Sequence, residues 1–136
     1  MTIVGFNFTK MLIEKKKTAT GKIDIANNVS IKEVKEAKLN LGNSKKPGLE
    51  FQFLFTSNYK EDIGKIELYG KVIYMDKEDN IKKILETWKK EKKVQKELLG
   101  SLYNSILSKC NVQAIILSRD IQLPPPIPLP KIKPNK

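Results

Sequence analysis

The chain has 136 residues, of which 40% are apolar, and its formal net charge is +11. This length is enough for one domain with its own hydrophobic core. No apolar run is long enough to cross a membrane, and residues 1–8 lack the basic start and the cleavage site of a signal peptide. We therefore expect a cytoplasmic protein without a membrane span.

The residue types that carry most enzyme chemistry are scarce. There is no histidine, which is the commonest general base and metal ligand. Cys110 is the one cysteine, so the chain cannot form an internal disulfide, and a single cysteine is not enough for a zinc site. Several acidic residues stand in expected turns, where solvated acids are ordinary: Asp62, Asp76, Glu78 and Asp79. The glycines are scattered along the chain and form no phosphate-binding loop. The sequence thus predicts a protein that is not an enzyme and holds neither a metal nor a cofactor.

The positive charge has two interpretations. A basic surface suits nucleic acid or the ribosome. Yet Arg119 is the only arginine, and arginine is the residue that makes bidentate contacts to guanine and phosphate. Richness in lysine and glutamate is also a signature of hyperthermophile proteins. We expect a thermophile surface first and RNA contact second.

Two strands are expected in the N-terminal part. Residues 6–13 alternate in polarity, and Lys10 interrupts the pattern, which indicates an edge strand or a bulge. One face of this strand would carry Phe6, Phe8 and Leu12, and the other Asn7, Thr9, Met11 and Ile13. A second strand is expected over 22–34, kinked at Asn27 and Asn28, and Leu39 and Leu41 could extend it. Residues 42–48 read as a loop.

The strongest strand signal lies in the middle of the chain. Residues 49–56 place Leu49 and three phenylalanines on one face, and residues 65–75 alternate in the same way. A turn over 58–64 joins them, so the two segments predict an antiparallel hairpin. The expected inward residues of the second segment are Ile66, Leu68, Gly70, Val72 and Tyr74.

Two helices are expected next. A short one begins near Asp79 or Asn80, either of which could cap it, and it presents Ile81, Ile84, Leu85 and Trp88 on one side. A long helix covers 94–119, with a core stripe of Leu99, Leu102, Tyr103, Ile106, Leu107, Cys110, Ala114, Leu117 and Ile121. A second stripe contains Val94, Leu98, Val112 and Ile116 together with Ser101 and Ser105. Because a chain this short has little else to cover that stripe, we expect it to be the interface of a homo-oligomer, a dimer or tetramer; burial within one domain is the alternative.

The C-terminal segment is rich in proline. Residues 123–130 read Leu-Pro-Pro-Pro-Ile-Pro-Leu-Pro, which cannot continue a helix and favours an extended path. The segment lacks the aromatic residues and flanking arginine of many proline-rich ligands. Because Leu123, Ile127 and Leu129 are strongly apolar, we expect the arm to pack on its own fold or on a neighbouring subunit. The expected organisation is one α+β domain over 1–123, followed by a proline-rich arm and basic tail over 124–136.

The element order resembles a known family. Four strands, a long helix and the segment Ile115–Pro130, whose end alternates prolines with apolar residues, resemble the SecB protein-export chaperones. The resemblance implies a four-stranded antiparallel sheet covered by a long C-terminal helix. It also implies a holdase, a chaperone that binds unfolded protein without catalysis. Bacterial SecB proteins are acidic and dock on the SecA motor, whereas this chain is basic, and its lysine richness suggests an archaeal thermophile, a group without SecA. The implied role is therefore a holdase without the motor.

The expected function is non-enzymatic binding of unfolded, nascent or partner protein; RNA- or ribosome-associated binding is the alternative. By the resemblance, an apolar groove beside the arm would hold an extended client. The candidate client-binding residues are Phe6, Phe8, Leu54, Tyr69, Trp88, Ile127 and Leu129.

Overall fold

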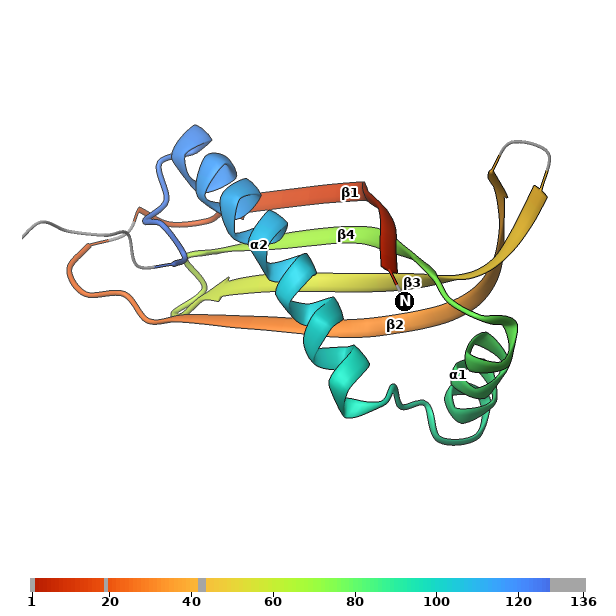
Figure 1. Cartoon of the computed structure of the whole chain (residues 1–136). Helices are drawn as coiled ribbons and strands as arrows, with labels where there is room; N and C mark the ends of the chain where they lie inside the picture. Colours follow the sequence, from red (N-terminus) through yellow and green to blue (C-terminus); the bar gives the residue numbers. More distant parts are fainter. Residues whose placement is uncertain (1, 19, 42–43, 128–136) are drawn as a thin grey trace, which may run out of the picture.

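The protein folds as a four-stranded antiparallel sheet with two helices, an α+β arrangement (Figure 1). The computed structural model describes residues 2–18, 20–41 and 44–127. The elements are β1 (Thr2–Lys15), β2 (Ile25–Leu41), β3 (Ser44–Tyr59), β4 (Gly64–Met75), α1 (Glu78–Glu91) and α2 (Lys96–Asp120). The predicted fold class is therefore confirmed.

The strands lie in the order β1-β4-β3-β2, so β1 and β2 form the two edges. The expected hairpin is β3–β4, in which Phe53 faces Gly70 and Phe55 faces Leu68. Strand β4 alternates strictly between buried and half-buried positions along its whole length. Period-two patterning of this kind fixes the register, because a slip by one residue would turn every apolar side chain to the other face.

The predicted faces of the first strand are partly wrong. Its register shifts between Phe8 and Lys10, where a bulge inserts one extra residue. Beyond that point Met11 pairs with Leu68 and Ile13 with Ile66, so both join Phe6 and Phe8 on the helix side. Leu12 pairs with Glu67 on the opposite face. Lys10 indicates an edge strand or a bulge, and the structure has both. The bulge reverses the alternation after Phe8, so the faces expected from unbroken alternation are wrong for Met11, Leu12 and Ile13.

Strand β2 is longer than predicted and is not kinked at the asparagines. Asn27 and Asn28 pair in regular register with Ser57 and Thr56, and the irregularity lies between Ile31 and Glu33. The expected loop is also too long, because Ser44–Gly48 already belong to β3 and pair with β2; residues 42–43 lie outside the described residues. The β3–β4 pairing starts only at Gly48, so Pro47 lies in a two-stranded extension. There each strand has one side without a partner strand, which tolerates a residue without an N–H.

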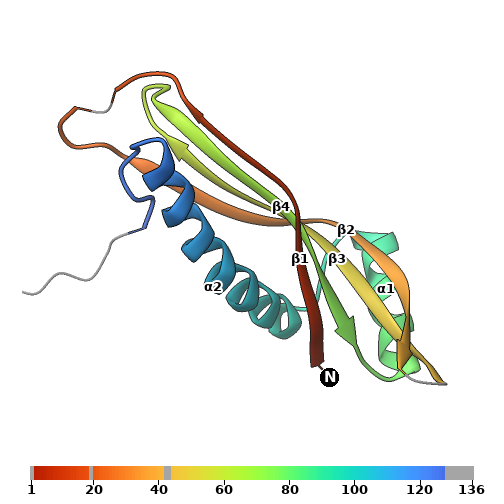
Figure 2. The same cartoon turned by 90° about the horizontal axis from the view of Figure 1, so that it is seen from above.

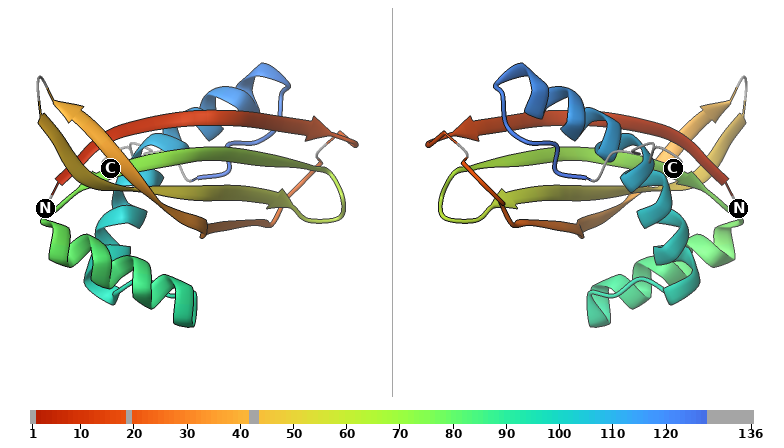
Figure 3. Two further views of the ribbon diagram at one scale, coloured as in Figure 1. Left: turned by 90° about the vertical axis from the view of Figure 1, so that its right-hand side faces the viewer. Right: turned by 90° about the vertical axis from the view of Figure 1, so that its left-hand side faces the viewer.

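One face of the sheet carries the hydrophobic core. Phe51, Phe53 and Phe55 of β3 are buried and belong to one cluster that includes side chains of both helices. Figure 2 shows α2 along this side of the twisted sheet. Figure 3 shows α2 on one side of the sheet, and no described helix covers the opposite face.

The core stripe of α2 differs from the predicted one. Its buried residues recur every fourth position: Leu98, Leu102, Ile106, Cys110, Ala114 and Ser118. Leu99, Tyr103, Leu107, Leu117 and Ile121 are only partly buried. A strict four-residue spacing drifts by about 40° per step round a helix. The contact line therefore winds round α2 as the helix passes obliquely over the twisted sheet (Figure 1).

Helix α1 begins earlier than expected. Its N-cap is Lys77, which makes no side-chain capping bond, so the assignment of Asp79 or Asn80 as the cap is wrong. The Asp76 carboxylate instead accepts hydrogen bonds from the Lys77 backbone N–H at 2.7 Å and from Asn80 Nδ2 at 3.1 Å. The predicted apolar side is confirmed: Ile81, Ile84 and Trp88 are buried and Leu85 packs against the core.

The described part of the proline arm, 123–127, packs on its own fold at the β3–β4 turn. Leu123 is buried, and its backbone N–H donates to the Ser118 carbonyl at 2.8 Å. The Tyr59 hydroxyl donates to the Pro124 carbonyl, and Asn27 Nδ2 donates to the Pro126 carbonyl at 3.0 Å. The expected docking of the arm is confirmed over this stretch.

Candidate protein-binding surface

Strand β1 presents an edge to the surroundings. It pairs with β4 along one side, from Thr2 to Lys15, and among the described residues no strand pairs with its other side. The backbone N–H and C=O groups on that side can form hydrogen bonds with another extended chain. On the other edge strand, β2, the Glu33 side chain accepts a hydrogen bond from the Trp88 indole of α1, and the Asn27 side chain donates one to the arm.

The helix-facing side of β1 carries apolar side chains that are incompletely covered. We call these residues the β1 apolar strip: Ile3, Phe6, Phe8, Met11 and Ile13. Helix α2 makes its main sheet contacts with β4, the neighbour of β1. As a result Met11 is 42% exposed, and the other four members are half-buried.

The centre of the strip is aromatic. The Phe6 and Phe8 rings meet edge to face with centroids 5.0 Å apart, and both approach the buried Phe53 ring, at 5.2 and 6.3 Å. Lys109 of α2 holds its Nζ 5.4 Å from the Phe6 ring centroid. Such contacts fix ring orientation, so the strip is a firm surface held on the core.

Two of the predicted client-binding residues lie on the other side of the sheet. Leu54 and Tyr69 face each other across β3 and β4, and Lys10 Nζ lies 5.3 Å from the Tyr69 ring centroid. This open face is laced with polar pairs. Lys71 Nζ lies 3.4 Å from Glu50, Lys65 Nζ lies 3.4 Å from Glu67, and the Tyr69 hydroxyl donates to Glu67 at 2.7 Å.

These pairs lower the pKa of both carboxylates. For Glu50 the main cause is the hydrogen bond from Gln52, and for Glu67 it is the one from Tyr69. On the open face, pairs of opposite charge therefore interrupt the apolar surface around Leu54 and Tyr69.

The remaining predicted client residues are separate from the strip. Trp88 is only 7% exposed, and its Nε1 donates to Glu33 Oε1 at 3.2 Å, which lowers the pKa of Glu33. Ile127 is half-buried at the end of the described arm, and Leu129 lies outside the described residues. The arm borders β2 and the β3–β4 turn, whereas Phe6 and Phe8 pair with the middle of β4. The structure therefore brings together Phe6 with Phe8, and Leu54 with Tyr69, but not all seven.

The four residues of the predicted oligomer interface also lie in different environments. Leu98 is 6% exposed and lies within the chain's own core, so its placement on a second, outward stripe is wrong. Val94 packs partly against the core. Val112 and Ile116 point outward and are 58% and 47% exposed.

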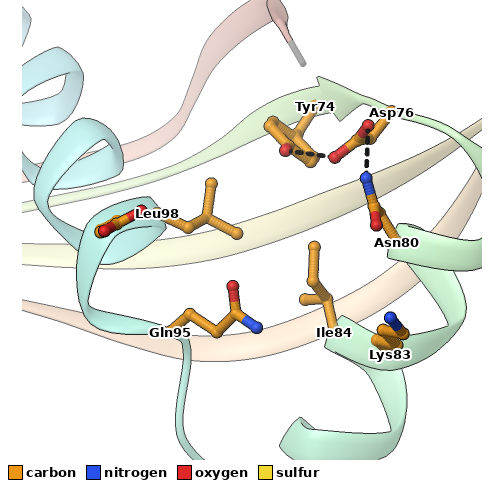
Figure 4. A pocket seen from close by; sticks show the side chains of 8 residues that line it. Tyr74, Asp76, Asn80, Lys83, Ile84, Gln95 and Leu98 are labelled. Atoms are coloured by element: carbon orange, nitrogen blue, oxygen red, sulfur yellow. Dashed lines mark hydrogen bonds between the residues drawn. The ribbon is translucent and has the colours of Figure 1, made fainter.

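A small polar pocket lies between the two helices over the end of β4 (Figure 4). It is lined by Tyr74, Asp76, Asn80, Lys83, Ile84, Gln95, Glu97 and Leu98. The Tyr74 hydroxyl donates to Asp76 Oδ2 at 2.8 Å, and burial raises the pKa of that phenol. Because Asp76 also accepts bonds from Lys77 and Asn80, its carboxylate is already engaged in holding the β4–α1 junction.

Cys110 is buried, and burial raises the pKa of its thiol to about 12. A thiol held neutral in this way is a core residue, since the thiolate is the reactive form. Across 2–18, 20–41 and 44–127, acidic residues and cysteine form no cluster suited to a metal ion.

The sequence could have revealed Met11. A lysine inside an alternating apolar pattern marks a bulge, and a bulge reverses the phase of every residue after it. With that correction Met11 and Ile13 would have joined Phe6 and Phe8, and the strip would have been visible before the structure.

Comparison with family models, curated proteins and solved structures gave no match. Neither described helix is long and apolar enough to cross a membrane. The function is therefore inferred from the chain's own residues.

Proposed function

We propose that the protein binds unfolded or partner polypeptide without catalysis, in the cytoplasm, as a holdase of the kind that its resemblance to SecB implies. The observation that carries this proposal is the coincidence of two features on β1: an edge without a partner strand among the described residues, and the β1 apolar strip beside it.

The two features suit one kind of ligand. An extended chain added to β1 would form backbone hydrogen bonds that are independent of its sequence. Every second side chain of that added strand would lie on the helix side, next to Phe6, Phe8 and Met11. Recognition of this type selects extended, apolar segments, which folded proteins bury and unfolded proteins expose.

The high charge supports the same role. A surface with apolar residues risks self-association, and a net charge far from zero opposes it. The charge of +11 would keep a chaperone dispersed while the strip remains open.

RNA or ribosome binding is the second candidate, and the same net charge favours it. The open sheet face offers Tyr69 and Lys10 for contact with a base and a phosphate. However, Lys71 and Lys65 on that face are paired with Glu50 and Glu67, so part of its positive charge is already compensated.

Salt separates the two candidates. Lysine–phosphate contacts release counterions, so RNA affinity falls steeply with ionic strength, whereas apolar burial does not. We expect a permanently unfolded protein to bind with an affinity that changes little between 50 and 500 mM salt, on the order of threefold at most. Tight RNA binding with a steep salt slope, and no binding of unfolded protein, would reverse the choice.

A further inference from the structure

The outward side of α2 is unlike the rest of this charged surface. Between Leu98 and Ser118 the only charged residue is Lys109, and it is turned toward Phe6 of the sheet. We call the following exposed residues the outer face of α2: Gly100, Asn104, Ser108, Val112 and Ile116. They keep the four-residue spacing of the core stripe and follow it by two positions, which on a helix is about 200° away, so they point away from the sheet.

The contacts within one chain do not explain why three of these positions hold the residues they do. Gly100 lies inside a helix, where glycine costs about 1 kcal/mol relative to alanine, yet a Cβ built there would meet nothing within 4 Å. Val112 and Ile116 are β-branched, large and exposed. Small residues thus occupy the first half of the face, and large apolar residues the second half.

Each end of α2 carries one basic and one acidic residue, side by side in the sequence. Lys96 and Glu97 stand at its start, Arg119 and Asp120 at its end, and all four are exposed. Turning the helix end over end about Ser108 places Glu97 level with Arg119 and Lys96 level with Asp120. The same operation places Asn104 level with Val112, each about 40° round the helix from Ser108, and Gly100 level with Ile116 at the rims of the face. The first half of α2 therefore complements the second half in size close to Ser108 and in charge at the ends.

We propose that the outer face of α2 packs antiparallel on the same face of a second copy of this chain, about a two-fold axis near Ser108. A self-complementary surface is what a two-fold interface requires. Val112 of one copy lies against the smaller Asn104 of the other close to the axis, while Gly100 and Ile116 lie at the rims of the contact, and a shallow crossing brings Glu97 and Arg119 within reach across each end. A parallel pair would instead place Glu97 beside Glu97 and Arg119 beside Arg119.

The pairing is independent of the proposed holdase function, because the outer face of α2 and the β1 apolar strip are different surfaces. A single helix pair buries less than a standard interface, so we expect a dissociation constant of about 1 to 100 μM.

Cysteine crosslinking tests the register. Residues on a two-fold axis meet their own copies, so Ser108→Cys should form a disulfide-linked dimer under mild oxidation. Asn104→Cys alone should not, since its copy lies at the other side of the axis, but Asn104→Cys combined with Val112→Cys should. The wild-type chain is the control, because its Cys110 is buried. Crosslinking of Asn104→Cys as readily as Ser108→Cys would overturn the register.

Light scattering tests the surface. Val112→Lys together with Ile116→Lys should raise the dimer dissociation constant at least tenfold while circular dichroism stays unchanged, because both side chains are exposed in the single chain. Glu97→Arg should weaken the dimer, and adding Arg119→Glu should restore it. A wild-type chain that is monomeric at 200 μM, or a dimer that survives both lysines, would contradict the proposal.

Discussion

At the scale of single residues, a few polar contacts fix the position of the second layer. Trp88 is the only tryptophan, and its indole N–H bonds Glu33 on edge strand β2, so a side-chain hydrogen bond ties α1 to the sheet in addition to its apolar packing. The hydrogen bond from Trp88 is the main reason why the pKa of Glu33 lies below its ordinary value of 4.5. The carboxylate form of Glu33 is the stronger acceptor, so protonation weakens the bond and makes the docking of α1 sensitive to acid.

Replacing Glu33 with Gln should reduce the acid sensitivity of the fold. A carboxyl whose pKa is lowered by folding adds stability above about pH 4.5, and this contribution is lost as the pH falls through the lower folded-state pKa. The wild type should therefore lose more stability between pH 6 and 3 than Glu33→Gln does, as measured by urea unfolding followed through Trp88 fluorescence. Glu36→Gln, at an exposed position on the same strand, is the control and should behave as the wild type. Equal losses in Glu33→Gln and the wild type would contradict the role of this contact.

Tyr59 holds the arm on the sheet through a hydrogen bond. Its hydroxyl is the donor to the Pro124 carbonyl, and burial raises the pKa of the phenol to about 12. Tyr59→Phe should lower the free energy of unfolding by about 1 kcal/mol, because the part-buried Pro124 carbonyl loses its hydrogen-bond donor. Tyr103→Phe is the matched control, since the Tyr103 hydroxyl has no hydrogen-bond partner among the described residues. If the two variants unfold at the same urea concentration, the arm is not held through Tyr59.

At the scale of elements, the sheet depends on close approach at Gly70. A Cβ at this position would lie 2.6 Å from the Phe53 ring and 2.5 Å from the Asn7 carbonyl oxygen. The missing side chain lets Phe53 cross β4 and reach Phe6 and Phe8.

Gly70→Ala should therefore destabilise the protein by about 1–3 kcal/mol, the usual cost of overpacking a core. Gly5→Ala is the comparison, because its Cβ would meet only the Ile73 side chain, at 3.3 Å. Thermal unfolding should rank the Gly70 variant clearly below the Gly5 variant. The opposite ranking would show that Phe53 can move aside at little cost.

Elements with strong periodicity were predictable, and their phase was harder to predict. The alternation in β3 and β4 fixed both strands and their inward faces, because three phenylalanines and their partners leave one register. In β1 the bulge after Phe8 reversed the phase, and in α2 the oblique path of the helix moved the core line onto Leu98 and Ser118. Both failures arise from tertiary geometry, the twist and bulging of the sheet, which the spacing of apolar residues along one segment does not contain.

At the scale of the whole molecule, the architecture separates three surfaces. Both helices contribute to the core on one side of a single sheet, which leaves the opposite face to paired charges. The β1 apolar strip lies at one edge, and the outer face of α2 points away from the sheet. Arm residues 123–127 are anchored at the end of the sheet where the β3–β4 turn lies, whereas Phe6 and Phe8 at the centre of the strip pair with the middle of β4.

The most direct measurement of the proposed function is the affinity of Met11→Lys for a permanently unfolded protein at high salt. Met11 is the most exposed member of the β1 apolar strip, so a lysine there should leave the fold intact. The loss of apolar contact should weaken binding by roughly tenfold, about 1.4 kcal/mol. Asn28→Lys adds the same charge at an exposed position on the far edge strand and should bind within about twofold of the wild type. If a correctly folded Met11→Lys variant binds the unfolded protein as tightly as Asn28→Lys does, the β1 apolar strip is not the binding surface.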